Sequence, residues 1–152
     1  MAATATFTLV PLARLEEACA AAESGSFPAW RKEHAKTAAQ YAKDGWLVPC
    51  ALGYLDEVVE ANLSSSAHDE VAARIAEALD CQCFVLEAAH RAAHYDDLDL
   101  ANFDREDLQA HYEELNGEST PGIGAHVLDA IRALREALSK VDDAKVVVVT
   151  IG

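Results

Sequence analysis

The sequence predicts an α+β fold, in which a small sheet containing both chain termini is packed with about six amphipathic helices. Two apolar segments rich in β-compatible residues, 4–10 and 146–151, lie at opposite ends of the chain. Between them, apolar side chains recur mostly at spacings of three and four, which is the period of a helix. The chain has 152 residues, and we expect a single globular domain over residues 1–152.

The N-terminal third should form one strand and two helices. Residues 4–10 alternate threonine with apolar side chains, a pattern typical of a half-buried strand. Pro11 suits the first turn of a following helix, which should end at the polar break of residues 24–28. A second apolar stripe at helical spacing predicts another helix over residues 29–43.

The middle of the chain is expected to add two helices and a strand. One helix follows Pro49, and the other follows Ser66, which with Asp69 fits a loose capping box. Residues 81–86 are short and rich in β-compatible side chains, so we interpret them as a strand. Residues 87–95 leave two alternatives open, a helical turn or a loop.

The C-terminal third should form two helices and the last strand. Asp104 is a good N-cap for a helix in which Leu108, Tyr112 and Leu115 face inward. The longest helix should follow the next Pro-Gly turn, with apolar residues at alternating spacings of four and three. Residues 146–151 are apolar on both faces, which predicts a central strand covered on both sides. The sequence does not give the order of the strands.

The charge balance restricts the classes of partner. The chain contains 12 Lys and Arg against 26 Asp and Glu, a formal net charge of −14. Affinity for a phosphate backbone comes mainly from Lys and Arg, so nucleic acid is not an expected partner. An anionic membrane would repel this surface for the same reason, whereas a basic protein would be attracted to it. The basic residues are scattered, and Arg31, Lys32 and Lys36 form the one local cluster.

The N-terminal segment and the cysteines suggest a cytoplasmic protein. The first positive side chain is Arg14, so the basic region that opens a secretory signal is missing. The longest clearly apolar stretch, residues 45–55, is much shorter than the roughly 20 residues that span a bilayer. The four cysteines do not have the arrangement of a disulfide framework, and we interpret them as free thiols.

Both ends of the chain resemble segments of a known family. The start reads TFTLVPLARLEEACAAAE, a strand leading into a helix, and the finish comprises REDLQAHYEELN, TPGIGAHVLDAIRALREALSKVDD and AKVVVVTIG. In this layout the chain resembles the YfbM-like family of uncharacterised bacterial proteins. The resemblance covers roughly half of the chain, since the middle does not match. It implies the α+β fold and carries no catalytic motif or activity.

One motif has the spacing of metal ligands. Glu87, His90 and His94 would share a face if this segment were helical, because they are three and four residues apart. Imidazole and carboxylate groups at that spacing can bind a divalent transition metal, the one candidate cofactor. Neither a second Glu-x-x-His copy nor the HExxH of zinc proteases is present, since Arg91 takes the place of the required Glu. The alternative interpretation is a polar surface turn after a strand.

The most prominent feature is electrostatic. Residues 96–118 contain nine acidic side chains against one basic, Arg105, so this segment has a net charge of −8. One interpretation is a solvated face that serves solubility. The other is a docking surface for a basic protein. We define the acidic face as the eight candidate contact residues Asp96, Asp97, Asp99, Asp104, Glu106, Asp107, Glu113 and Glu114.

The hypotheses for function follow from these features. The sequence contains no G-x-S-x-G elbow, no G-x-G-x-x-G and no P-loop, so we lean away from an enzyme. The first hypothesis is a non-catalytic protein-binding module, immunity-like or regulatory, that contacts a basic protein. The alternative is a metal-binding protein or metal-dependent enzyme that uses the metal-ligand motif. A third is a ligand pocket lined by Trp30, Tyr41 and Trp46. The sequence leaves the oligomeric state open.

Overall fold

The structure is a computed structural model that describes residues 2–152, and a four-stranded antiparallel sheet lies at its centre. The strand order is β2-β1-β4-β3, which makes the first and last strands of the chain neighbours. Thr4 and Gly152, at the two chain ends, exchange backbone hydrogen bonds of 3.0 and 3.2 Å. The predicted α+β class is confirmed. The strand bounds are Ala5–Pro11 for β1, Lys36–Ala39 for β2, Gln82–Leu86 for β3 and Lys145–Ile151 for β4.

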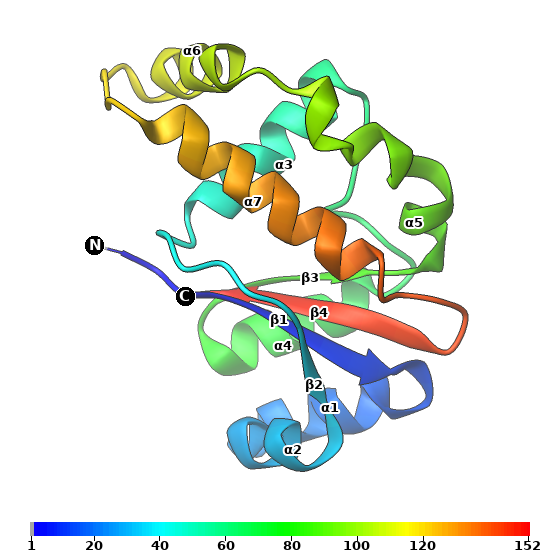
Figure 1. The fold of residues 1–152 in the computed structure, drawn as a ribbon. Helices are drawn as coiled ribbons and strands as arrows, with labels where there is room; N and C mark the ends of the chain where they lie inside the picture. The colour runs from blue at the N-terminus through cyan, green and yellow to red at the C-terminus, as the bar shows by residue number, and fades with distance from the viewer. Residues whose placement is uncertain (1) are drawn as a thin grey trace.

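Helices cover both faces of this sheet (Figure 1). One face carries α1, α2 and α4, while the other carries α3 and α7, with α5 and α6 outside them. Residues 2–152 thus form seven α-helices, one more than the sequence predicts, and three short 3-10 helices. The α-helices are Leu15–Glu23, Phe27–His34, Leu47–Val58, Asp69–Leu79, Ala88–His94, Arg105–Asn116 and Ile123–Leu138. The 3-10 helices are η1 Leu12–Arg14, η2 Asp96–Leu98 and η3 Leu100–Asn102.

Strand β4 is central and buried on both faces, as its apolar sequence predicts. Val147 and Val149 belong to the core beneath α3 and α7. Val146 and Val148, on the alternate face, belong to the core beneath α1, α2 and α4. The sheet therefore separates two hydrophobic cores, which explains why this strand has no polar face.

The predicted helix over residues 29–43 is wrong in its second half. Helix α2 ends at His34, and Ala35 takes an extended conformation with φ −134° and ψ 169°. The chain then forms β2, whose residues pair with the outer edge of β1. Pairing satisfies backbone groups that β1 would otherwise leave unbonded, and this tertiary gain overrides the helical spacing of the side chains. Trp30 and His34 keep their helical relationship, with ring centroids 5.5 Å apart.

The other middle elements form close to where their local signals place them, although α3 begins at Leu47 and so contains Pro49 in its first turn instead of following it. Of the two alternatives for residues 87–95, the structure has the helix, α5. The N–H of Ser66 donates to the Asp69 carboxylate at 2.9 Å, and the Ser66 hydroxyl accepts from the N–H of His68 at 3.0 Å. These bonds form a turn before α4, but the N-cap of the helix is His68 and not Ser66, so α4 begins at Asp69, two residues later than the predicted capping box places it. None of the helices within residues 2–152 is both long and apolar enough to cross a bilayer.

Candidate functional site

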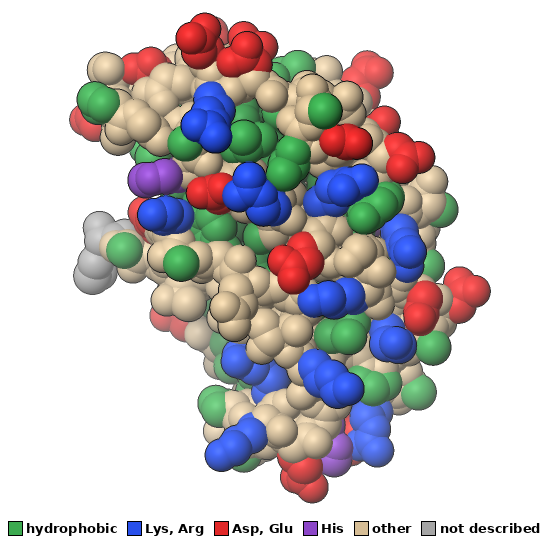
Figure 2. Space-filling view, in the orientation of Figure 1, with side chains coloured by type: hydrophobic (Ala, Val, Ile, Leu, Met, Phe, Trp, Pro, Cys, Tyr) green, Lys and Arg blue, Asp and Glu red, His purple; other side chains and the backbone are tan. Residues whose placement is uncertain are grey.

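The acidic face lies on η2, on the N-cap residues of η3 and α6, and on α6 itself, which is at the end of the molecule away from the sheet (Figure 1). Seven of its eight side chains are exposed, and Glu113 is partly buried. Carboxylates gather over α6 in the space-filling view, at the top of Figure 2. The fold therefore leaves the carboxylates of this segment at the surface as a group.

Few of these carboxylates have a partner within residues 2–152. Asp97 pairs with His94, at 3.3 Å between Oδ2 and Nδ1. Asp99 and Asp104 accept backbone N–H bonds of 3.0 and 2.8 Å at the starts of η3 and α6. The remaining five make no ion pair with any side chain that the structure describes, and neither does Arg105. Most of the negative charge is therefore available to a partner.

Helix α6 begins and ends as the sequence predicts. The Asp104 side chain caps its first turn, and Gly117 ends it with φ at +68°, a conformation that favours glycine. The amide of Gln109 bridges α6 to the next turn: it donates to the Thr120 carbonyl at 2.6 Å and accepts from the Gly124 N–H at 2.7 Å. These contacts hold the N-terminal half of α6 against α7.

The predicted inward stripe of α6 is only partly correct. Leu108 is buried and Tyr112 is partly buried, but Leu115 is 60% exposed. The backbone of α6 approaches α7 near Arg105 and Gln109, at Gly124. Leu115, on the last turn, lies beyond this contact and projects into solvent among the carboxylates. A single exposed leucine is ordinary on a protein surface, so Leu115 adds apolar contact area without marking a binding site by itself.

A shallow hollow adjoins the start of α6. It has a volume of about 640 Å³, and Phe103 contributes an aromatic surface to it. Its lining comprises Ala101, Asn102, Phe103, Asp104, Arg105, Glu106 and Asp107. The acidic face thus combines exposed charge with a concave patch and apolar area.

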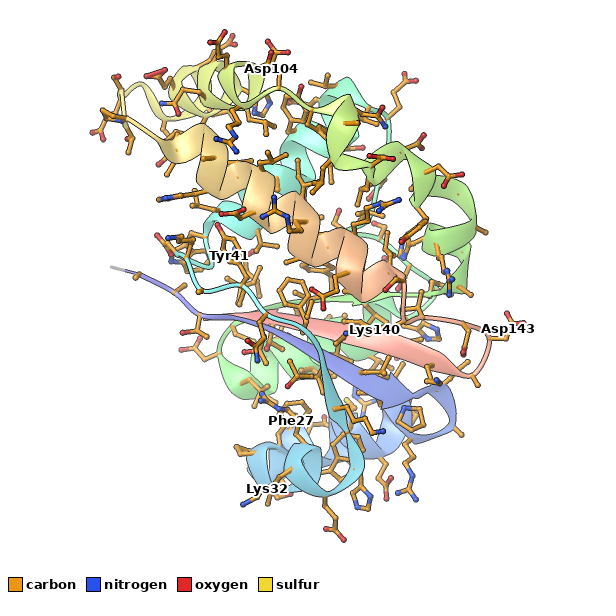
Figure 3. The ribbon with its side chains drawn as sticks, in the orientation of Figure 1. Phe27, Lys32, Tyr41, Asp104, Lys140 and Asp143 are labelled. Atoms are coloured by element: carbon orange, nitrogen blue, oxygen red, sulfur yellow. The ribbon has the colours of Figure 1, made fainter. Side chains whose placement is uncertain are left out.

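Basic side chains gather on a different part of the surface, a feature that sequence reasoning missed. Figure 2 shows Lys and Arg spread over α7 and the sheet below it. Arg132 and Arg135 come from α7, and Lys36 comes from β2. Lys140 lies beside β2 (Figure 3), where its Nζ donates to the carbonyl oxygen of Ala38. Residues that are scattered along the chain therefore share one face, because β2 lies next to α7 in space.

The candidate metal residues are engaged in local structure. Glu87 is the N-cap of α5: its carboxylate accepts the backbone N–H of His90 and also the N–H of Ala67, the latter at 2.8 Å. The Nδ1 of buried His90 accepts from the N–H of Glu87 at 3.1 Å. The other ring nitrogen, Nε2, therefore carries the proton and donates to the Ser65 carbonyl at 2.7 Å. Both His90 nitrogens are occupied in this arrangement.

His94 does not join these two residues, since its Nδ1 faces Asp97. Among residues 2–152, no three His, Cys, Asp or Glu side chains are placed to hold a metal ion. The Glu-x-x-His spacing instead forms a capping box in which histidine takes the role that Glu or Gln usually has.

The three aromatic residues of the predicted ligand pocket lie in different places. Trp30 packs in the core under α1 and α2, and Tyr41 packs in the core on the opposite face of the sheet. The Tyr41 hydroxyl donates to the His126 carbonyl at 2.8 Å, and Trp46 is exposed at the start of α3. Two hollows include Tyr41 in their lining, and neither of them includes Trp30 or Trp46.

The cysteines are free thiols with raised pKa values. Burial raises the pKa of Cys50, at the start of α3, and raises the pKa of Cys83 on β3 to about 12. Burial also raises the pKa of the Cys19 and Cys81 thiols. A nucleophilic cysteine needs the opposite shift, so these thiols do not form an activated catalytic group.

No protein-family model matches the sequence, and no curated protein or solved structure matches it either. The resemblance to the YfbM-like family therefore stays a prediction. The arguments for function depend on the geometry and charge described above.

Proposed function

We propose that this protein is a non-catalytic, cytoplasmic module that binds a basic partner protein through the acidic face. The observation that carries the proposal is the group of exposed carboxylates on this face that make no ion pair within residues 2–152. Unpaired surface charge of one sign attracts an oppositely charged protein and orients it during encounter. A partner presenting Lys or Arg would supply the missing ion pairs.

Apolar area within the face supports protein binding over solubility alone. The hollow beside Phe103, at the start of α6, and Leu115, on its last turn, offer contact surface at the two ends of the helix, each next to acidic residues in the sequence. Protein interfaces commonly combine an apolar centre with a polar rim. Charge that served only solubility would require neither feature.

The separation of charge over the surface also favours this proposal. Lys and Arg gather over α7 and β2, away from the carboxylates of α6 (Figure 2). Within the described segment 96–118, Arg105 is the one cation set against nine acidic side chains, so the acidic face keeps a net negative field, which is screened over about 8–10 Å at physiological salt. The free thiols fit the reducing cytoplasm that the proposal includes.

A charge-matched pair of variants tests the proposal. The first is the triple variant Glu106→Gln, Glu113→Gln and Glu114→Gln on α6. The control is Glu70→Gln, Glu77→Gln and Asp143→Asn, three exposed residues elsewhere that make no ion pair in the described chain. Both variants change the net charge equally, and each alters one acidic residue in a first helical turn.

Each protein is immobilised and exposed to cell lysate at about 0.1 M salt and, separately, at about 1 M salt. The higher concentration shortens the Debye length from about 10 to about 3 Å and so weakens charge attraction. We expect a basic protein to be retained at low salt by the wild type and the control, and to be lost from the α6 variant. If no basic protein is retained, or if the α6 variant retains it as well as the control does, the proposal is wrong.

A further inference from the structure

We propose that the outer edge of β3 binds an extended peptide carrying basic side chains, which adds a fifth strand to the sheet. Recognition by strand addition uses the backbone groups of an unpaired edge, and pockets for side chains give it specificity. The site lies on β3, α3 and α4, so the proposal does not rest on the function proposed for the acidic face.

The register of the sheet shows which backbone groups of β3 are free. Thr4 and Gly152 form a hydrogen-bonded pair, so every second residue of β4, counted back from Gly152 to Val146, directs its backbone N–H and C=O toward β1. Val149 lies in the alternate set, so its backbone groups point the other way and bond to Phe84 on β3. Cys83, one residue earlier than Phe84, directs its N–H and C=O away from β4. No hydrogen bond to either group is found within residues 2–152.

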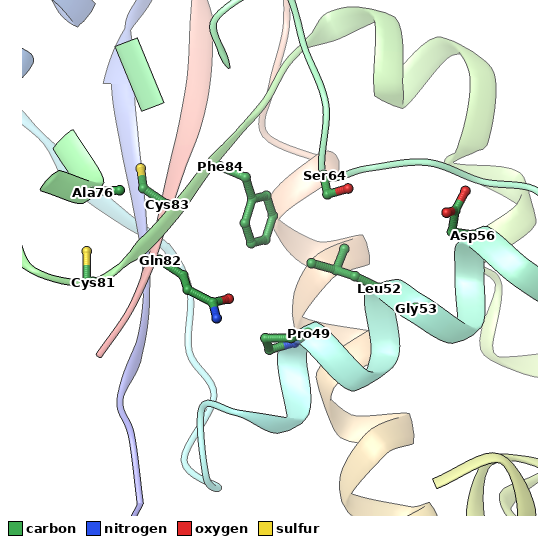
Figure 4. Close-up of a pocket in the computed structure, with 10 residues that line it drawn as sticks. All are labelled: Pro49, Leu52, Gly53, Asp56, Ser64, Ala76, Cys81, Gln82, Cys83 and Phe84. Carbon is green, nitrogen blue, oxygen red and sulfur yellow. The ribbon is translucent and has the colours of Figure 1, made fainter. Parts of the chain in front are cut away.

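A groove follows this free edge (Figure 4). Its volume is about 530 Å³, and its walls come from α3 on one face of the sheet and from α4 on the other. A cavity that reaches both faces must pass around the outside of the edge strand. The lining residues are Pro49, Leu52, Gly53, Asp56, Ser64, Ala76, Cys81, Gln82, Cys83 and Phe84.

Gly53 widens the groove on the α3 side, because it has no side chain to extend into it. It lies in the interior of a helix, where glycine is less stable than alanine. Its backbone does not require glycine, and a Cβ built at this position would meet nothing within 4 Å. The fold itself therefore gives no reason for the missing side chain, which leaves space beside Leu52 for a ligand.

The charge of the site indicates a basic occupant. Asp56 lines one end of the groove and makes no ion pair within the described chain. A second copy of this protein would bring another net charge of −14 to the same edge, which opposes self-pairing. A peptide with Lys or Arg would be attracted by Asp56 and by the overall charge.

The opposite edge of the sheet is less open to strand addition. There, the Lys140 ammonium donates to the carbonyl oxygen of Ala38 on β2. A charged side chain placed across an edge discourages pairing with another strand. Within residues 2–152, no charged side chain bonds to the backbone of Cys83 on the β3 edge, so this is the edge available to a partner.

The bound strand would use a small number of backbone bonds. Cys83 would exchange an N–H and a C=O bond with the peptide residue opposite it. The N–H of Cys81 already donates to the carbonyl oxygen of Ala76 at 3.1 Å, so at this residue only the carbonyl oxygen would be left to accept a third hydrogen bond from the peptide. Apolar peptide side chains on one face would contact Leu52 and Pro49 on the α3 wall.

A defined peptide tests the proposal. The probe is a capped hexapeptide of alternating Val and Lys, and the readout is amide hydrogen exchange at Cys83 in the full-length protein. Two control peptides are used: one with N-methyl groups on alternate amides, which cannot pair with an edge, and one with Glu in place of Lys. We expect the probe to slow exchange at Cys83 about 10-fold when present at about ten times its Kd.

Variants of the groove complete the test. Gly53→Trp fills the groove and should abolish protection of the Cys83 amide, whereas the matched control Gly53→Ala should retain it. Asp56→Asn should weaken binding of the Lys probe, and this variant covers the case in which the tryptophan disturbs the fold. The proposal is overturned if the probe gives no protection at its solubility limit, or if the N-methylated peptide protects Cys83 equally.

Discussion

Glu87 and His90 hold each other in place through a reciprocal pair of hydrogen bonds. The Glu87 carboxylate accepts the His90 backbone N–H, and the His90 Nδ1 accepts the Glu87 backbone N–H at 3.1 Å. The imidazole also joins α5 to the preceding loop through its 2.7 Å bond to the Ser65 carbonyl. A pair of residues with the spacing of metal ligands thus acts as a helix cap and a tether.

Substitutions of His90 distinguish this structural role from metal binding. His90→Ala leaves the Glu87 N–H and the Ser65 carbonyl unpaired, and should lower the free energy of unfolding by about 1–3 kcal/mol. His90→Gln should retain most of the stability, because its carbonyl oxygen can accept and its NH₂ can donate. Urea unfolding measures both values. A stabilisation of the wild type by added zinc, lost in His90→Gln, would show instead that the residue is a metal ligand.

Two glycines in helices should respond to alanine in opposite ways. A Cβ at Gly124 would clash with the Arg105 carbonyl oxygen, so Gly124→Ala should force α6 away from α7 and cost about 1–3 kcal/mol of stability. Gly53→Ala meets no neighbour and should stabilise the protein by about 0.5–1 kcal/mol. Thermal or urea unfolding compares the two variants. Equal destabilisation by both would contradict the packing described for α3 and α7.

These packing details mark the limit of what the sequence predicts. Apolar periodicity identifies β1, β3 and β4 and most helices, because their patterns are local. Strand β2 has the sequence KTAA, and alanine favours helices, so its strand conformation comes from pairing with β1. No local signal could reveal that contact.

The candidate sites show the same division. The acidic residues of α6 can be counted in the sequence, and the capping signals of that helix are local. Whether Leu115 is buried depends on where α6 crosses α7, and the gathering of basic residues depends on the position of β2. The free edge of β3 follows from the strand order, which residue patterns do not give.

The partly buried thiol of Cys83 should make stability depend on alkaline pH. Burial raises its pKa to about 12 in the native state, whereas an unfolded thiol ionises near pH 8.5, roughly its ordinary value. Between these values the unfolded state binds fewer protons than the native state, so the free energy of unfolding falls as pH rises. At neutral pH, below both pKa values, the contribution to stability is fully present.

The Cys83→Ala variant isolates this effect from other groups that titrate in the same range. Urea unfolding of wild type and variant is compared at pH values from about 8 to about 11. We expect the wild type to lose stability more steeply. Parallel curves would mean that the native thiol ionises near its ordinary pKa.

Two glutamates at opposite ends of α6 should separate the stability of the fold from binding. Glu106 lies in the first turn, near the positive end of the helix dipole, and Glu114 lies near the negative end. Glu106→Gln should therefore lower the free energy of unfolding, and Glu114→Gln should raise it, each by about 0.3–1 kcal/mol at low salt.

Both changes remove one negative charge from the acidic face. If a basic partner binds there, both variants should lose affinity although their stabilities shift in opposite directions. Unfolding in urea and titration calorimetry with the captured partner measure the two quantities separately, and affinities that followed stability would indicate an effect through folding alone.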